Sequence, residues 1–160
     1  MKDIYFEILD FEGKIPDNYC YTDLGYTDNL LETTRELYKK QGLPNDNEYL
    51  KKAGAPLTNN PGGRHVVFFY ENGISTFVYY THFSNFPLEI FNRAHEESHA
   101  VITLGLKEEL KKKMNLSFLA NLSKENFCDK AGLSAIKNKG LKLPPGLIRL
   151  WPGERVYFQW

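Results

Sequence analysis

Two histidines four residues apart, with a glutamate directly after the first, are the feature that most constrains how this chain folds. The segment from Ala94 to Ala100 reads A-H-E-E-S-H-A, which has the H-E-x-x-H spacing. On an α-helix, positions four apart lie about 40° from each other around the axis, so His95 and His99 present their imidazoles to one point. Glu96 projects about 60° from His99, within reach of a water molecule at that point. The spacing predicts a helix that binds a divalent metal, with Glu96 as general base. The alternative is a solvated helix face.

Length and composition favour one domain spanning residues 1–160. Of the 160 residues, 42% are hydrophobic and 25% are charged, which is the ordinary globular range. Twenty basic and 20 acidic side chains cancel, so neither nucleic acid nor an anionic membrane is expected as a partner. No secretory leader or membrane-spanning run is recognisable, so we expect a cytoplasmic protein. Cys20 and Cys128 are expected to be thiols.

The segments ahead of the motif carry strand, loop and helix signals. Apolar and polar residues alternate within Ile4–Ile15, which predicts a strand, whereas turn formers over Pro16–Thr27 predict a loop. Apolar residues at helical spacing predict helices over Leu30–Gln41 and Asn47–Ala53, each followed by a glycine. Ala55–Gly63 is rich in Pro, Gly and Asn and predicts a second loop.

A β-hairpin is predicted directly before the motif helix. Two β-rich runs, His65–Tyr70 and Ile74–Tyr80, flank an Asn-Gly pair, the preferred type I′ turn. Pro87 fits the first turn of the motif helix, where its missing N–H is harmless, and Gly105 supplies a stop.

The chain after the motif predicts two further helices and a short strand. The highly charged Lys107–Lys113 predicts an exposed helix, whose lysines we interpret as a solvated face. Asn121 or Ser123 caps a helix that runs through Ile136. A strand is expected around Val156–Trp160.

A catalytic zinc site needs a third protein ligand, and the helix after the motif offers one. Zinc in such sites takes three protein donors and leaves the fourth position to water. Glu125 lies about 25 residues beyond His99, and Asp129 falls on the same helical face four positions later. We therefore predict Glu125 as the ligand and Asp129 as an outer carboxylate that orients a ligating histidine. The competing donors are His65, His82, Cys128 and Asp129 itself.

These motifs resemble the gluzincin branch of zinc metallopeptidases, and within it the ImmA/IrrE-type metallopeptidase domains. The similarity covers residues 64 to 137 and rests on the H-E-x-x-H motif and on the later pattern Glu125-x-x-Cys128-Asp129. It implies an α+β fold: a minimal zincin-like domain with a small antiparallel-containing sheet, whose β-hairpin packs on an active-site helix followed by a ligand-bearing helix. It also implies that His95, His99 and Glu125 bind Zn²⁺ and that Glu96 is the base. The chain departs from the family pattern at Glu97-Ser98, where a hydrophobic residue and a glycine usually precede the second histidine.

The expected activity is hydrolysis of a peptide bond, which makes a peptide or protein the expected substrate. In this mechanism Glu96 takes a proton from a metal-activated water and passes it to the leaving amine. If the strand Ile74–Tyr80 is the sheet edge beside the cleft, it would pair with an extended peptide. Two alternatives remain: a zincin-fold module that binds a protein partner without cleaving it, and an effector that uses the same chemistry on one intracellular protein.

The reaction also needs a donor that stabilises the oxyanion. Several side chains could act as this donor or contact the substrate: Tyr79, Tyr80, His82, Arg149 and Tyr157.

Overall fold

The computed structural model describes residues 16–83, 86–113 and 124–142, which form an α+β arrangement. The described elements, in chain order, are β1 (Tyr19–Tyr26), α2 (Leu30–Lys40), α3 (Asn47–Lys52), β2 (Gly63–Tyr70), β3 (Gly73–Tyr80), α4 (Phe86–Thr103), α5 (Lys107–Lys113) and α6 (Lys124–Asn138). The expected α+β class is therefore confirmed. The strands predicted within Ile4–Ile15 and Val156–Trp160, and the caps Asn121 and Ser123, lie outside the described residues.

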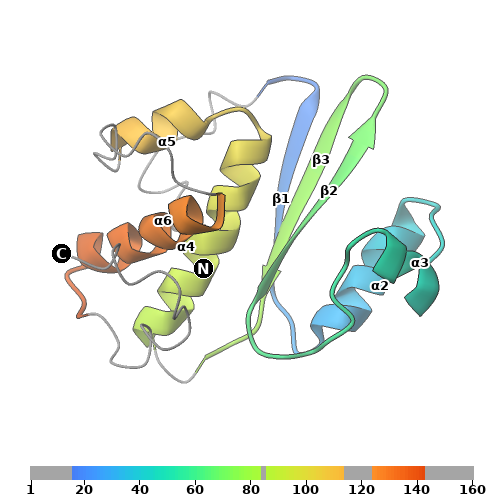
Figure 1. Ribbon diagram of the computed structural model, residues 1–160, viewed down its shortest axis with the longest axis horizontal. Helices are drawn as coiled ribbons and strands as arrows, with labels where there is room; N and C mark the ends of the chain where they lie inside the picture. The colour runs from blue at the N-terminus through green and yellow to red at the C-terminus, as the bar shows by residue number, and fades with distance from the viewer. Residues whose placement is uncertain (1–15, 84–85, 114–123, 143–160) are drawn as a thin grey trace.

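The three strands form one mixed sheet in the order β1-β3-β2. The β2–β3 hairpin is antiparallel, as predicted, whereas β1 pairs in parallel with β3. The prediction that Ile74–Tyr80 is a sheet edge was wrong, because β3 is paired on both sides. The edge strand on the hairpin side is β2. Figure 1 shows the sheet between two layers of helices, with α4, α5 and α6 on one face and α2 and α3 on the other.

Strand β1 replaces the loop predicted over Pro16–Thr27. Its sequence, YCYTDLGY, has no sustained alternation of apolar and polar residues, and most of its side chains are half-buried. The pairing partner comes about 55 residues later, with Tyr19 opposite Ile74. A bulge between Asp23 and Gly25, where Gly25 has φ 76°, also interrupts the two-residue alternation of side chains along the strand. The strand depends on distant pairing, which a local pattern does not reveal.

The hairpin turn lies one residue earlier than the Asn-Gly pair predicts. Tyr70 pairs with Gly73, so Glu71 and Asn72 form the two-residue loop and Gly73 begins β3. A Cβ at Gly73 would lie 1.9 Å from the carbonyl oxygen of Asn18, which precedes β1. The glycine is therefore required by the close approach of another strand.

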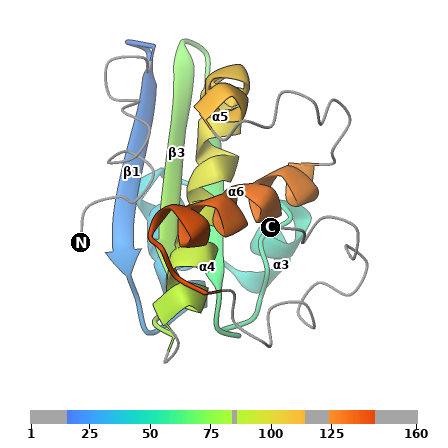
Figure 2. The ribbon, with the colours of Figure 1, turned by 90° about the vertical axis from the view of Figure 1, so that its left-hand side faces the viewer.

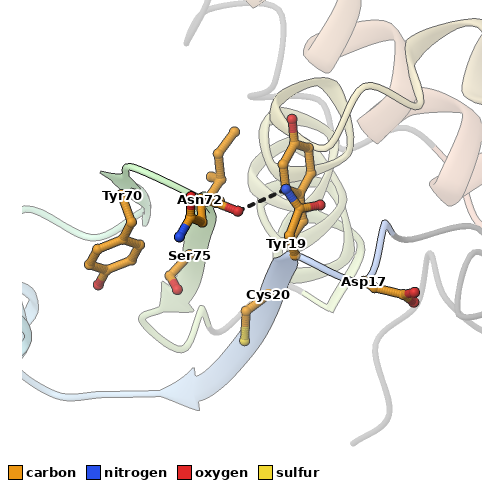
Figure 3. A pocket seen from close by; sticks show the side chains of 9 residues that line it. Asp17, Tyr19, Cys20, Tyr70, Asn72 and Ser75 are labelled. Atoms are coloured by element: carbon orange, nitrogen blue, oxygen red, sulfur yellow. Dashed lines mark hydrogen bonds between the residues drawn. The ribbon is translucent and has the colours of Figure 1, made fainter.

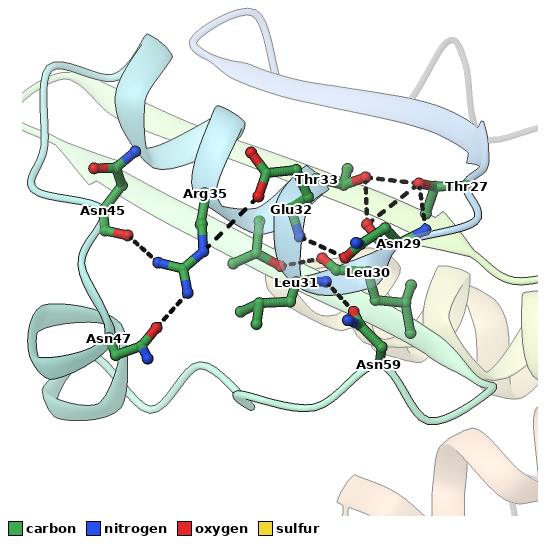
Figure 4. A network of polar contacts seen from close by, with 11 residues as sticks. Thr27, Asn29, Leu30, Leu31, Glu32, Thr33, Arg35, Asn45, Asn47 and Asn59 are labelled. Carbon is green, nitrogen blue, oxygen red and sulfur yellow. Dashed lines mark hydrogen bonds and ion pairs between the residues drawn. The ribbon is translucent and has the colours of Figure 1, made fainter.

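Helices α2 and α3 cover the face of the sheet opposite the motif helix, and both begin as predicted. Asn29 caps α2 by accepting a hydrogen bond from the Glu32 N–H at 2.9 Å. Arg35 joins the two helices, because its guanidinium donates to the Asn45 carbonyl and to the Asn47 side chain (Figure 4). These contacts hold the layer that buries Leu30, Leu37, Leu50, Phe68 and Tyr79.

Helix α4 carries the motif and runs along the other face of the sheet. Pro87 lies in its first turn, as predicted, and Gly105 follows its end with φ 81°. Helix α6 crosses α4 closely (Figure 2). A Cβ at Gly132 would lie 2.6 Å from the Phe91 ring, so the absence of a side chain there permits the crossing. No described helix is long and apolar enough to cross a membrane.

A buried ion network joins α4 to β1. The Arg93 side chain is 2% exposed; its Nε donates to Glu97 Oε1 at 3.1 Å and its Nη2 donates to Asp23 Oδ2. The guanidinium also lies 5.7 Å and 5.2 Å from the ring centres of Tyr26 and Tyr80. One guanidinium thus pairs with two carboxylates from different elements.

We predict that Arg93→Met destabilises the protein by about 3–5 kcal/mol, because it removes the cation that pairs with Asp23 and with the fully buried Glu97. Urea unfolding followed by circular dichroism measures the change. The control is Lys52→Met, since Lys52 and Glu48 form an exposed pair at 3.0 Å and should contribute less than about 1 kcal/mol. Equal losses in the two variants would contradict the structural importance of the network.

Candidate metal centre

Three side chains from two helices bring possible metal donors together. His95 and His99 lie on α4, and Glu125 lies in the first turn of α6. The two Nε2 atoms are 3.1 Å apart. Glu125 Oε2 lies 3.3 Å from His95 Nε2, and Glu125 Oε1 lies 3.2 Å from His99 Nε2. The three residues predicted as ligands therefore meet at one point, although they are separated by up to 30 positions.

The second imidazole nitrogen of His95 faces a buried carboxylate. Asp129 Oδ1 lies 2.8 Å from His95 Nδ1, and the Asp129 side chain is almost fully buried. This contact directs Nε2 of His95 towards His99 and Glu125. Asp129 thus occupies the position predicted for an outer carboxylate that orients a ligating histidine.

The pKa values of the three clustered side chains are shifted in different directions. Burial disfavours a charge on His95, but hydrogen bonds to Asp129 and Glu125 outweigh burial and raise its pKa. Burial and the neighbouring His95 lower the pKa of His99 to about 4. The hydrogen bond from His95, together with His99, lowers the pKa of Glu125 to about 2 despite partial burial. Glu125 is therefore a carboxylate and His99 a neutral imidazole, both in the form that binds metal, whereas the raised pKa of His95 means that this residue must release a proton when metal binds.

The donor set and its spacing fit zinc. Two imidazoles and one carboxylate are a known donor set of catalytic zinc sites, and bonds of about 2.0–2.1 Å in a tetrahedron place donors about 3.3 Å apart. The two imidazole nitrogens are 3.1 Å apart, His95 Nε2 lies 3.3 Å from Glu125 Oε2 and His99 Nε2 lies 3.2 Å from Glu125 Oε1; with one oxygen taken from Glu125, the three donor atoms lie within 4.8 Å of one another. Among the described residues, no further His, Cys, Asp or Glu joins the cluster.

Glu96 lies beside the cluster, between α4 and the start of the edge strand β2. A Cβ built on Gly63 would lie 2.4 Å from Glu96 Cγ. Burial raises the pKa of Glu96 to about 7; His95 opposes the rise, and Glu125 adds to it. A carboxylate with a pKa near neutrality is suited to exchange protons with water.

The β2 strand contributes residues that the motif analysis did not assign to the site. The His65 ring lies parallel to the His99 ring, with centres 5.9 Å apart, and His65 Nε2 is 2.5 Å from Thr76 Oγ1. Arg64 donates to the Gly63 carbonyl at 2.8 Å, and its charge opposes the rise in the Glu96 pKa. His65 was considered only as a competing ligand. Its position in a strand, two residues from Gly63, carries no local signal of this contact.

Other candidate residues lie away from the three donors. Cys128 is fully buried and is not among the donors that gather in the cluster. His82 is bound to Glu89 at 2.9 Å and stacks on Tyr26. The prediction of Tyr79 as an oxyanion donor was wrong, because this residue is buried on the opposite face of the sheet, where its hydroxyl contacts the Thr34 hydroxyl.

Of the remaining oxyanion candidates, only Tyr80 lies among the described residues. The Tyr80 hydroxyl is committed to Glu97 at 3.4 Å. Tyr157 and Arg149 lie outside the described residues.

The departure from the family pattern at Glu97-Ser98 has a structural explanation. Glu97 is fully buried and pairs with Arg93 on the β1 side of α4. Ser98 is also buried, and its hydroxyl donates to the Ala94 carbonyl at 2.6 Å. Both polar side chains are therefore satisfied away from the cluster.

A separate hollow lies at the hairpin end of the sheet. It measures about 300 Å³ and is bounded by the start of β1 and the β2–β3 turn (Figure 3). Asp17 and Cys20 are among its lining residues, and none of the cluster residues lines it. This hollow is not part of the metal centre.

Comparison with known proteins does not identify the chain: no family matches its sequence, and neither a curated protein nor a solved structure resembles it. The chemistry of the site must therefore be argued from its own residues.

We predict that Asp129→Asn weakens zinc binding about 10- to 100-fold, because the loss of an outer carboxylate has this effect in metal sites. Glu125→Ala should remove a ligand and weaken zinc binding further. Isothermal titration with zinc measures both constants. Cys128→Ala is the control on the same helix and should bind zinc like the unaltered chain. Loss of zinc in Cys128→Ala with retention in Glu125→Ala would contradict the assignment.

Proposed function

We propose that this protein is a zinc-dependent peptidase built on a minimal zincin-like domain, in which His95, His99 and Glu125 hold the metal and Glu96 is the general base. One observation supports this most directly. Two imidazoles and a carboxylate converge with separations of 3.1–3.3 Å, beside a glutamate that is not one of the three donors. A closed structural zinc site takes a fourth protein ligand, whereas a catalytic site leaves that position open.

The residues divide the chemistry between them. A zinc ion bound here supplies Lewis-acid activation of water and of the scissile carbonyl. The Glu96 carboxylate accepts the proton of the attacking water and returns it to the leaving amine nitrogen. Asp129 holds the Nδ1 proton of His95, so that Nε2 keeps its lone pair for the metal. His65 and Gly63 bound the site on the β2 side.

The edge strand β2 provides a route for an extended peptide. Thr81 N–H donates to the Gly62 carbonyl at 2.8 Å, so Gly62 and Thr81 are a hydrogen-bonded pair. Along an antiparallel ladder, hydrogen-bonded and non-hydrogen-bonded pairs alternate. The backbone N–H and C=O groups of His65, Val67 and Phe69 therefore point away from β3. No other described strand pairs with β2. A peptide added along this edge would pass Gly63 and His65, which contact Glu96 and His99. The substrate strand therefore belongs on β2 and not, as first expected, on β3.

We predict that Glu96→Gln keeps about one zinc ion per chain but lowers peptide hydrolysis about 10²- to 10⁴-fold, because the amide cannot accept the proton. Zinc content is measured by atomic absorption, and hydrolysis by mass spectrometry of a random peptide library. The control is Glu36→Gln, which changes an exposed side chain of α2 and should cleave peptides at the normal rate.

The same experiment tests the alternative of a binding module. If the unaltered zinc-loaded chain cleaves no peptide, or if Glu96→Gln cleaves as fast, the peptidase assignment is wrong. Binding of a protein partner that is unaffected by Glu96→Gln would then favour the module.

We predict that Val67→Pro retains the fold, since proline is tolerated in edge strands where the N–H faces outward. It should raise KM for an extended peptide about three- to tenfold, the effect of one lost hydrogen bond. Steady-state kinetics on a cleaved library peptide provides the measurement. Val67→Ala keeps the N–H and is the control; an equal KM in both variants would argue against pairing along β2.

A further inference from the structure

Most of the other described glycines allow a backbone angle that other residues rarely adopt, whereas Gly63 meets a different structural requirement. Five of them have positive φ: Gly25 at the bulge of β1, and Gly42, Gly54, Gly105 and Gly140 after the ends of helices. Gly63 has no such backbone angle, so alanine could adopt its conformation. What position 63 cannot accept is a side chain. A Cβ there would lie 2.4 Å from Glu96 Cγ and 3.1 Å from both Cδ and Oε1.

We propose that Gly63 is a positioning residue for Glu96: by lacking a side chain, it leaves the space in which the carboxylate is held beside the metal centre. The inference rests on the proposed function for its catalytic consequence, but the contact itself does not depend on that function.

The clash is not one that a flexible side chain would relieve locally. The nearest Glu96 atom is Cγ, close to the helix, so it moves only if χ1 rotates or the backbone shifts. In a helix, χ1 near +60° collides with the preceding turn, which leaves few alternatives. A change of χ1 well would carry the carboxylate several ångströms away, because the side chain swings about its Cα–Cβ bond.

The edge strand cannot easily withdraw to make room. Gly63 is paired with Tyr80 in the ladder, and the neighbouring Gly62 is fixed to Thr81 by hydrogen bonds at 2.8 Å. Tyr80 in turn is fully buried against α4. The strand and the helix are therefore held at a fixed separation, and the Glu96 side chain occupies the gap.

The test compares Gly63→Ala with Gly62→Ala. A Cβ on Gly62 would meet its nearest atoms, in Arg64 and Asn60, only at 3.9 Å, an ordinary contact. Gly63→Ala should lower kcat about 100-fold, as expected for a displaced base. Zinc affinity should be unchanged, because the three donors are untouched. KM should change little, because a Cβ at position 63 faces Glu96 and leaves the outward backbone groups of His65, Val67 and Phe69 in place. Gly62→Ala should leave all of these values unchanged. A Gly63→Ala variant with normal kcat overturns the proposal.

A double-mutant cycle tests the contact without reference to activity. Glu96→Ala removes Cγ, Cδ and Oε1, the three atoms that a Cβ at position 63 would meet. Gly63→Ala should therefore lower the urea midpoint in the native background, and this shift should largely disappear in the Glu96→Ala background. Equal shifts in both backgrounds overturn the proposal.

The cycle remains decisive if Gly63→Ala alone fails to fold. Recovery of folding in the double variant supports the contact with Glu96, whereas continued failure to fold overturns it. If the unaltered chain cleaves no peptide, the proposed function fails, but the cycle still reports on Gly63 and Glu96.

Discussion

The candidate metal centre depends on the close crossing of α4 and α6. At the crossing, Gly132 has no side chain, and a Cβ there would lie 2.6 Å from the Phe91 ring. The short separation brings the first turn of α6 over the motif, so that Glu125 reaches both imidazoles while Asp129, one turn later, meets His95. One packing contact between the two helices thus positions both Glu125, a candidate donor, and Asp129, the carboxylate that contacts His95. A site built on helices in this way is held more rigidly than one built on loops.

Helix α4 buries charged side chains on two of its sides, and those on each side pair with a different element. Towards β1, Arg93 pairs with both Glu97 and Asp23. Towards α6, the histidines meet Glu125 and Asp129. Burial of an unpaired charge costs several kcal/mol, so a helix of this composition is stable in the interior only when both groups are complete. This explains why a polar pair, Glu97-Ser98, is accommodated in the middle of the motif.

The parts of the molecule that were predictable from sequence are those with local signals. The spacing of His95 and His99, the capped helices and the hairpin follow from periods of 3.6 and 2 residues, and Asp129 follows from its place one turn after Glu125. Strand β1 was missed because its partner lies far along the chain, and its pairing also made β3 central. The contact of His65 with the site was missed for the same reason: only the packing of β2 on α4 brings its ring to His99.

The metal donors and the base are held by different contacts, although they are neighbours in sequence. Consecutive helical residues point about 100° apart. His95 therefore faces α6, where Glu125 and Asp129 meet it, whereas Glu96 faces β2, where Gly63 leaves room for it. Because the substrate route proposed here also follows β2, the base lies on the side from which a peptide would enter. The two histidines are buried on α4, whereas Glu125 is exposed at the start of α6. In the proposed function, metal affinity would depend mainly on the contacts between α4 and α6, and proton transfer mainly on the contact between α4 and β2.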